Sequence, residues 1–207
     1  MSDRPKTPRE AWQAMIDGNQ RFVSGDLAHP RQDIDHREKL AEKQTPFAAL
    51  FGCADSRLSA EIIFDVGLGD LFVVRNAGQV IAETILGSLE YAVEVLGVPV
   101  ILVLGHDECG AIRATIDATE GNLNSQGEFI HNLVERIRPT VEAANLAGKH
   151  EIDDITELHV QDTINELLTR STLIANAVKA GKLAVVGANY KLTLGEVHPI
   201  VSVGDIN

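Results

Sequence analysis

Cysteine is scarce in this chain: only two of its 207 residues, Cys53 and Cys109, carry a thiol. So few cysteines exclude a fold built on a disulfide framework, and in a reducing compartment two thiols stay free. They are therefore either unrelated buried side chains or members of a reactive or metal-binding site. The residues around each cysteine decide between these alternatives.

Long apolar segments and an excess of positive charge are also missing. The longest mostly apolar run covers residues 98–104, far short of the roughly 20 residues of a membrane helix. The N-terminal stretch MSDRPKTPREAW has no apolar segment of the kind found in signal peptides. Eighteen basic residues against 30 acidic ones give a net charge of −12, which disfavours nucleic acid and anionic membranes as partners. We expect a cytoplasmic protein that binds neither.

Hydrophobic residues make up 44% of the chain, enough for one sizeable core. We expect a single domain over residues 1–207, with an N-terminal helical arm (1–45) followed by an α/β core (46–207). No internal repeat or interdomain linker interrupts the chain.

The arm begins with a strong helix signal. Thr7 and Glu10 form a T-x-x-E capping box, and Gly25 suits the end of the helix. The apolar face of this extending N-terminal helix carries Trp12, which would contact either its own chain or a partner subunit.

Short apolar runs alternate with helical patterns along the core. Strands are predicted at residues 47–52, 71–75, 100–105 and 183–187, with an edge strand at 197–203. Helices are predicted at residues 37–42, 59–64, 80–96, 111–119, 129–147 and 154–180. The alternation indicates an α/β fold, a mostly parallel sheet of about four parallel strands plus an edge strand, flanked by helices. In such sheets ligands bind beyond the carboxyl ends of the strands.

Both cysteines follow predicted strands. The stretch CADSR, residues 53–57, comes directly after the first strand and places Cys53, Asp55 and Arg57 at alternate positions. In extended chain, alternate side chains point the same way, so a thiol, an acid and a cation converge there. The strand at 100–105 runs into His106 and Cys109, spaced H-x-x-C, a spacing at which imidazole and thiolate can face one ion.

If the two strands are neighbours, Cys53, His106 and Cys109 meet at one point. Two thiolates and an imidazole suit zinc, with a fourth position open to water or to a carboxylate such as Asp55. An isolated H-x-x-C is more often an ordinary histidine beside a buried cysteine, but the C-x-D-x-R stretch after another strand favours the zinc site. The remaining histidines lie in polar or surface-like stretches and are not expected to bind metal: His29, His36, His131, His150, His159 and His198.

These motifs resemble the β-class carbonic anhydrases of the bacterial type. The resemblance is carried by CADSR (53–57), GDLFVVRNAG (69–78), SLEYAVEVLGV (88–98), GHDECG (105–110) and GNQRFVSG (18–25). It implies one zinc per chain, held by Cys53, His106 and Cys109, with Asp55 and Arg57 as the catalytic pair beside the metal. It also implies a homodimer or tetramer whose active-site pocket forms at the subunit interface.

The resemblance further implies a set of substrate-binding positions: Gln32, Phe72, Ala77, Tyr91 and Gly110. On the sequence alone, Phe72 and Tyr91 are equally well explained as core aromatics. Two positions depart from the family pattern: Ala111 stands where a second glycine is common, and Ala77 replaces a larger aliphatic residue. Both departures bear on the shape of the pocket.

The expected activity is zinc-dependent, reversible hydration of carbon dioxide to bicarbonate and a proton by zinc-bound hydroxide. Asp55, paired with Arg57, would orient the hydroxide, and in a closed state Asp55 would itself be the fourth zinc ligand. One alternative is a related zinc hydrolase of carbonyl sulfide or carbon disulfide, and another is a non-catalytic zinc or redox-sensing domain. A nucleotide-binding protein is excluded because no G-x-G-x-x-G or G-x-x-x-x-G-K-[ST] motif follows a strand.

Overall fold

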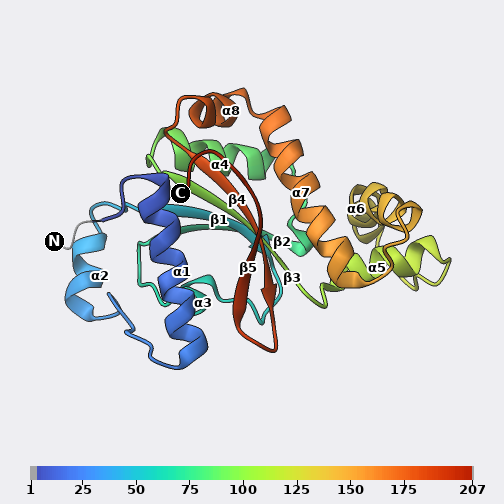
Figure 1. The fold of residues 1–207 in the computed structure, drawn as a ribbon, viewed down its shortest axis with the longest axis horizontal. Coiled ribbons are helices and arrows are strands. Elements are labelled where there is room, and N and C mark those ends of the chain that lie inside the picture. Colours follow the sequence, from blue (N-terminus) through green and yellow to red (C-terminus); the bar gives the residue numbers. More distant parts are fainter. Residues whose placement is uncertain (1–3, 207) are drawn as a thin grey trace.

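The computed structural model describes residues 4–206 and contains one five-stranded sheet in the order β2-β1-β3-β4-β5 (Figure 1). The strands are β1 (Ala48–Cys53), β2 (Leu71–Asn76), β3 (Val100–His106), β4 (Ala184–Lys191) and β5 (Glu196–Val203). Strands β1 to β4 run parallel to one another, and β5 pairs antiparallel with β4. The predicted fold class is confirmed, including the four parallel strands and the edge strand.

The central strands β1 and β3 are buried along their whole length, as continuously apolar segments of a parallel sheet are expected to be. Successive side chains alternate between the two faces of the sheet. Leu50 and Leu102 pack under α1 (Pro8–Ser24) and α3 (Ala60–Ile63). Phe51 and Val103 pack on the other face, under α4 (Glu83–Glu94), α7 (Ile152–Arg170) and α8 (Thr172–Lys179).

Helices α5 (Gly110–Thr119) and α6 (Glu128–Leu146) form a further layer beside α7, at the edge of the molecule (Figure 1). Their apolar residues form a separate cluster with Cys53 and Cys109. This layer therefore covers the carboxyl ends of β1 and β3, where ligands of parallel sheets bind.

The N-terminal helix begins and ends as its sequence predicts. Thr7 and Glu10 form the reciprocal capping box, and Gly25 ends the helix in the left-handed conformation, with φ of 81°. The helix α1 does not extend from the molecule, however, because it packs against its own chain. Met15 is fully buried and Trp12 is 8% exposed, so Trp12 contacts its own body.

Two predicted helices differ from the observed ones. The helix predicted at 80–96 starts three residues later, because a 3₁₀ turn (Ala77–Gln79) and extended backbone at Val80 precede α4. The helix predicted at 154–180 is two helices, α7 and α8, separated at Ser171. Ser171 is extended and its hydroxyl accepts a hydrogen bond from the Ile174 amide, so it caps α8. The short helix predicted at 37–42 is α2 (Ile34–Leu40).

Within residues 4–206, no helix combines the length and the apolar character needed to span a bilayer.

Candidate metal centre

Three side chains from two neighbouring strands and the following helix meet at one point. Cys53 is the last residue of β1, His106 is the last residue of β3, and Cys109 precedes the first turn of α5. Their ligand atoms all lie within 4.8 Å of one another, and all three residues are buried. The structure thus brings together the three side chains whose spacing predicted a metal site.

The histidine of this cluster is oriented for metal binding. Its Nδ1 lies 2.7 Å from the Asp107 carbonyl oxygen, which can only accept, so Nδ1 carries the proton. Nε2 therefore presents its lone pair to the two sulfur atoms. Nε2 is buried and has no hydrogen-bond partner among the described residues. A buried acceptor without a partner is costly, and a metal ion would satisfy it.

The two thiols interact directly with each other. The pKa of Cys53 is lowered, chiefly because the Cys109 thiol donates a hydrogen bond to it. The pKa of Cys109 is correspondingly raised by this bond to Cys53 and by burial. Because zinc binds cysteine as the thiolate, binding of the cation would release the protons that the pair carries. A donor set of two sulfurs and one imidazole nitrogen fits zinc.

Asp55 and Arg57 lie beside the cluster as a paired acid and cation. The Arg57 guanidinium donates two hydrogen bonds to the Asp55 carboxylate, at 2.9 and 2.7 Å. These bonds hold the pKa of Asp55 well below its usual range. The second oxygen of Asp55 is 4.0 Å from His106 Nε2, so the carboxylate borders the position where a metal would be held. In this arrangement Asp55 is paired with Arg57.

A second arginine, which the sequence interpretation missed, braces this segment. Arg75, near the end of β2, donates hydrogen bonds to the carbonyl oxygens of Cys53 at 2.8 Å and Asp55 at 2.6 Å. A cation bridging two carbonyls fixes the backbone that carries the ligand and the carboxylate. Its position within the motif GDLFVVRNAG, at the end of a strand, was the available signal.

The predicted substrate-binding positions fall into two groups. Ala77 and Gly110 lie at the cluster, because Ala77 follows the residue that pairs with Cys53 and Gly110 follows Cys109. Both residues are exposed. Phe72 does not reach the cluster of its own chain. It pairs with Ala49, four residues before Cys53, which puts it about 13 Å back along the sheet.

Tyr91 lies against Phe72, and Gln32 lies in a loop near the start of β2. The rings of Phe72 and Tyr91 are in contact, with centroids 6.1 Å apart, and Tyr91 is 44% exposed, so it is not a core aromatic. Gln32 is exposed in a loop whose Arg31 carbonyl accepts a bond from Leu68, before the start of β2. Phe72 and its contact Tyr91 therefore lie toward the start of β2, whereas the cluster lies at its end.

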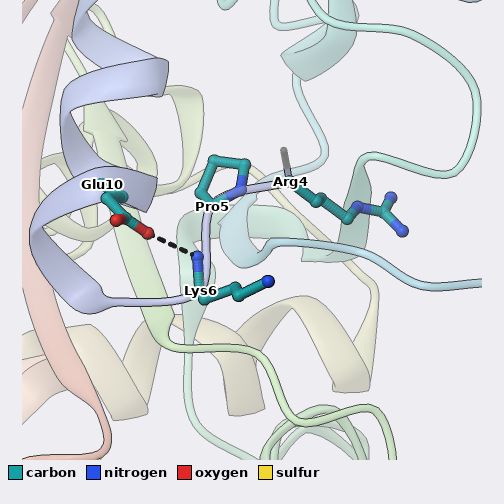
Figure 2. Close-up of a pocket in the computed structure, with 4 residues that line it drawn as sticks. All are labelled: Arg4, Pro5, Lys6 and Glu10. Carbon is teal, nitrogen blue, oxygen red and sulfur yellow. Dashed lines mark hydrogen bonds between the residues drawn. The ribbon is translucent and has the colours of Figure 1, made fainter. Parts of the chain in front are cut away.

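The structure has a narrow hollow at the cluster and a wider one elsewhere. The hollow beside Cys53 has a volume of about 10 Å³, about the size of one water molecule. A wider hollow of about 280 Å³ is lined by Arg4, Pro5, Lys6 and Glu10, as Figure 2 shows. It contains none of the predicted site residues, and Arg4 contacts Gly69, which lies before the start of β2.

Gly78 allows the turn after β2 to approach the cluster closely. Its φ is 72°, and its amide donates a hydrogen bond to the Cys53 sulfur at 3.4 Å. A Cβ atom at this position would lie 2.8 Å from the Cβ of Ala111 and 2.9 Å from Ile137. Glycine is therefore required both by the backbone conformation and by the packing of α5 and α6.

Gly78→Ala should lower the free energy of unfolding by about 2–4 kcal/mol, the sum of left-handed strain and overpacking. Gly121→Ala is the matched control, because Gly121 also has positive φ but has open space around it. We expect the control to cost about 1 kcal/mol in denaturant unfolding. Equal losses in the two variants would show that packing around Gly78 is unimportant.

One histidine is not where the sequence suggested. His159, expected in a surface-like stretch, is buried on α7 with 5% exposure. Its Nε2 lies 2.7 Å from the Gly78 carbonyl oxygen. The prediction was wrong because the polar neighbours of His159 in the sequence lie on other sides of the helix.

Comparisons with known proteins agree with this geometry. The sequence profile described as carbonic anhydrase matches residues 48–197. A carbonic anhydrase of Mycolicibacterium smegmatis is 48% identical over 199 residues, covering 96% of each chain. A solved structure of the Coccomyxa β-carbonic anhydrase in complex with acetazolamide is 27% identical, has a TM-score of 0.70, and covers 91% of this chain and 86% of that one. A tetrameric β-carbonic anhydrase from Sordaria macrospora shares the fold, with a TM-score of 0.72, 23% identity, and coverage of 91% and 96%.

Proposed function

This chain belongs to the carbonic anhydrase family, and on that premise we propose that it catalyses the zinc-dependent, reversible hydration of carbon dioxide to bicarbonate and a proton. The observation that carries the proposal is the cluster of two sulfurs and one imidazole within 4.8 Å, bordered by the Asp55–Arg57 pair. Three protein ligands leave one coordination position open, which is the arrangement of catalytic rather than structural zinc sites.

Each residue of the centre has a separate part in this chemistry. Cys53, His106 and Cys109 would hold the metal. Zinc bound there supplies a Lewis acid that lowers the pKa of water toward neutrality. Asp55 stays ionised because Arg57 holds it, and it accepts a hydrogen bond that orients the attacking oxygen. If the ion pair with Arg57 opened, Asp55 would become the fourth metal ligand and would occupy the position that water needs.

The alternatives are less well supported. A zinc hydrolase of carbonyl sulfide or carbon disulfide would use the same donor set, but the relatives described above are carbonic anhydrases. A redox-sensing domain would not need the Asp55 carboxylate to be fixed beside the metal by Arg57. The test is turnover by the zinc-loaded protein on carbon dioxide, carbonyl sulfide and carbon disulfide in parallel. We expect carbon dioxide to be the preferred substrate, and preference for a sulfur-containing gas would overturn the proposal.

A second copy of the chain is proposed to complete the pocket. Phe72 lies about 13 Å back along the sheet from the cluster, Tyr91 contacts it, and Gln32 lies in a loop near the start of the same strand. This strand, β2, is at the edge of the sheet that the described residues form. The ring of Tyr91 is 44% exposed there, and it contacts the half-buried ring of Phe72. In a homodimer these two rings would face the metal centre of the partner and provide an apolar wall for carbon dioxide. Dimers of such dimers would give a tetramer.

Mixing two inactive variants tests this shared pocket. Cys109→Ala lacks a metal ligand but keeps the aromatic wall, whereas Phe72→Ala with Tyr91→Ala keeps the ligands but lacks the wall. After subunits are exchanged, half of the dimers are mixed and one of the two sites in each is complete. Activity should therefore return to about a quarter of the wild-type value. A mixture no more active than the mean of its components would contradict the shared site.

The cytoplasm is the proposed location of this reaction. Both ligand cysteines are free thiols in the structure, and a reducing compartment keeps such a pair available for a metal.

A further inference from the structure

His159 is a buried polar side chain that the proposed reaction does not use. It lies on α7 with 5% exposure, and burial lowers its pKa, so the imidazole is neutral. Its Nε2 carries the proton, because the Gly78 carbonyl oxygen 2.7 Å away can only accept a hydrogen bond. Its Nδ1 has no partner among the described residues. Buried polar atoms are nearly always hydrogen-bonded, so packing alone does not explain a histidine at this position.

The residue that receives this hydrogen bond also contacts the metal centre. The amide of Gly78 donates to the Cys53 sulfur at 3.4 Å, while its carbonyl accepts from His159. A single residue thus connects α7 with a metal ligand. An amide that donates to a thiolate withdraws charge from the sulfur and favours its deprotonated, metal-binding form.

The turn that carries Gly78 needs to be held in place. Gly78 and Gln79 both have positive φ, 72° and 40°, so two consecutive residues are in the left-handed region. Asn76 joins the two ends of the turn through its side chain, which bonds the backbone of Val80. His159 provides a hydrogen bond to the middle of the turn, at the residue that faces Cys53.

We propose that His159 is a positioning residue for the metal ligand Cys53, acting through the backbone of Gly78. By bonding the Gly78 carbonyl it keeps the amide of the same residue directed at the sulfur. The inference rests on the proposed zinc site. It predicts that losing the imidazole donor weakens zinc binding although no ligand is removed.

Two substitutions of equal side-chain length separate the hydrogen bond from packing. His159→Met removes the donor, whereas His159→Gln keeps an N–H group that can reach the carbonyl. Zinc release to a chelator should be about tenfold faster from His159→Met than from wild type, at the low end of effects seen for residues behind metal ligands. His159→Gln should recover most of the difference. In the cobalt-substituted proteins, the sulfur-to-metal charge-transfer band should shift in His159→Met and return toward the wild-type position in His159→Gln.

Thr156→Val is the matched control. Thr156 lies one turn earlier on α7 and is fully buried, and its hydroxyl donates a hydrogen bond to the Ile152 carbonyl of its own helix. The control should have wild-type zinc release and a wild-type cobalt spectrum, even if its stability is lower. A Met variant that releases zinc at the wild-type rate, or a Gln variant no better than Met, would overturn the proposal.

A measurement on the wild-type protein covers the case in which the variants do not fold. With a spin-active cadmium isotope in place of zinc, the Gly78 amide proton should show a coupling to cadmium through the N–H···S bond. Its absence would overturn the proposal. Wild-type protein that binds no zinc at all would instead refute the proposed function, so the two failures are distinguishable.

Discussion

Cys109→Ala is expected to remove zinc from the protein and to abolish carbon dioxide hydration. Cys109 is fully buried, and its sulfur is one of only three donors in the cluster. Two remaining protein ligands do not hold zinc against water, because zinc sites in proteins use at least three. Zinc should fall from about one atom per chain to less than about a tenth of that, and the hydration rate should fall by at least about a thousandfold.

Elemental analysis and stopped-flow hydration of the same preparations measure both effects. Thr115→Val is a suitable control, since Thr115 is a fully buried residue of α5 whose hydroxyl donates a hydrogen bond to the Ala111 carbonyl of its own helix. It should keep its zinc and most of its activity. Unchanged zinc content in Cys109→Ala would show that the cluster is not the metal site.

Arg57→Ala is expected to retain zinc but to lose about a hundredfold in hydration rate at neutral pH. No metal ligand is altered, but the two guanidinium hydrogen bonds to the Asp55 carboxylate are removed, while the bond from the backbone amide of residue 57 remains. A misplaced orienting group typically costs that much, and the released carboxylate is free to occupy the open metal position. Arg57→Lys should restore activity only in part, because an ammonium group cannot reproduce the bidentate contact.

The loss in Arg57→Ala should depend on pH. In the wild type Arg57 holds the pKa of Asp55 well below its usual range, and without Arg57 that pKa rises toward the ordinary value of about 4. Asp55 is therefore ionised above about pH 5.5 in both proteins, and its protonation does not cause the loss. A released carboxylate competes with solvent for the metal, and hydroxide competes better as pH rises. The deficit should be largest in acid and smaller in alkaline solution.

The pH–rate profiles of wild type and Arg57→Ala, with zinc content measured on each, test this prediction. Arg113→Ala is the control for loss of a positive charge near the site, because Arg113 is also exposed and pairs loosely with Glu108 at 3.9 Å. It should show the wild-type profile. Wild-type activity of zinc-loaded Arg57→Ala at every pH would refute the role given to the pair.

The metal centre could be predicted from sequence because of a general property of parallel sheets. Strands that are continuously apolar are buried, and their carboxyl ends meet at one edge. Cys53 and His106 end two such strands, and those strands are neighbours. The H-x-x-C spacing then places Cys109 at the start of the next helix, so only the adjacency of the strands had to be assumed.

The proposed substrate pocket was less predictable from the sequence, because the positions of its residues depend on strand register and because the proposal needs a second chain. The sequence does not show that Phe72 pairs with Ala49 and so lies well behind Cys53.

The strand predicted at 183–187 is shorter than the observed β4, which continues beyond residue 187. Its buried Asn189 has no apolar signal and is paired with Asp153, 36 residues away in the chain.

Two further predictions differ from the structure because the local sequence signal was ambiguous. Ser171 is a good helix cap, yet the pattern on either side of it continues as a helix, so one long helix was predicted instead of α7 and α8. His159 looked solvent-exposed because acidic and amide residues surround it in the sequence. Its burial follows from the packing of α7 against a turn 81 residues earlier.

The most direct test of the account is a zinc titration of the metal-free wild-type protein, followed by stopped-flow carbon dioxide hydration at each step. Activity should be absent without metal, rise in proportion to added zinc, and stop rising at about one zinc per chain, since the structure offers one cluster of three suitable donors per chain within residues 4–206. Hydration by the metal-free protein, or none after one zinc per chain is bound, would contradict it.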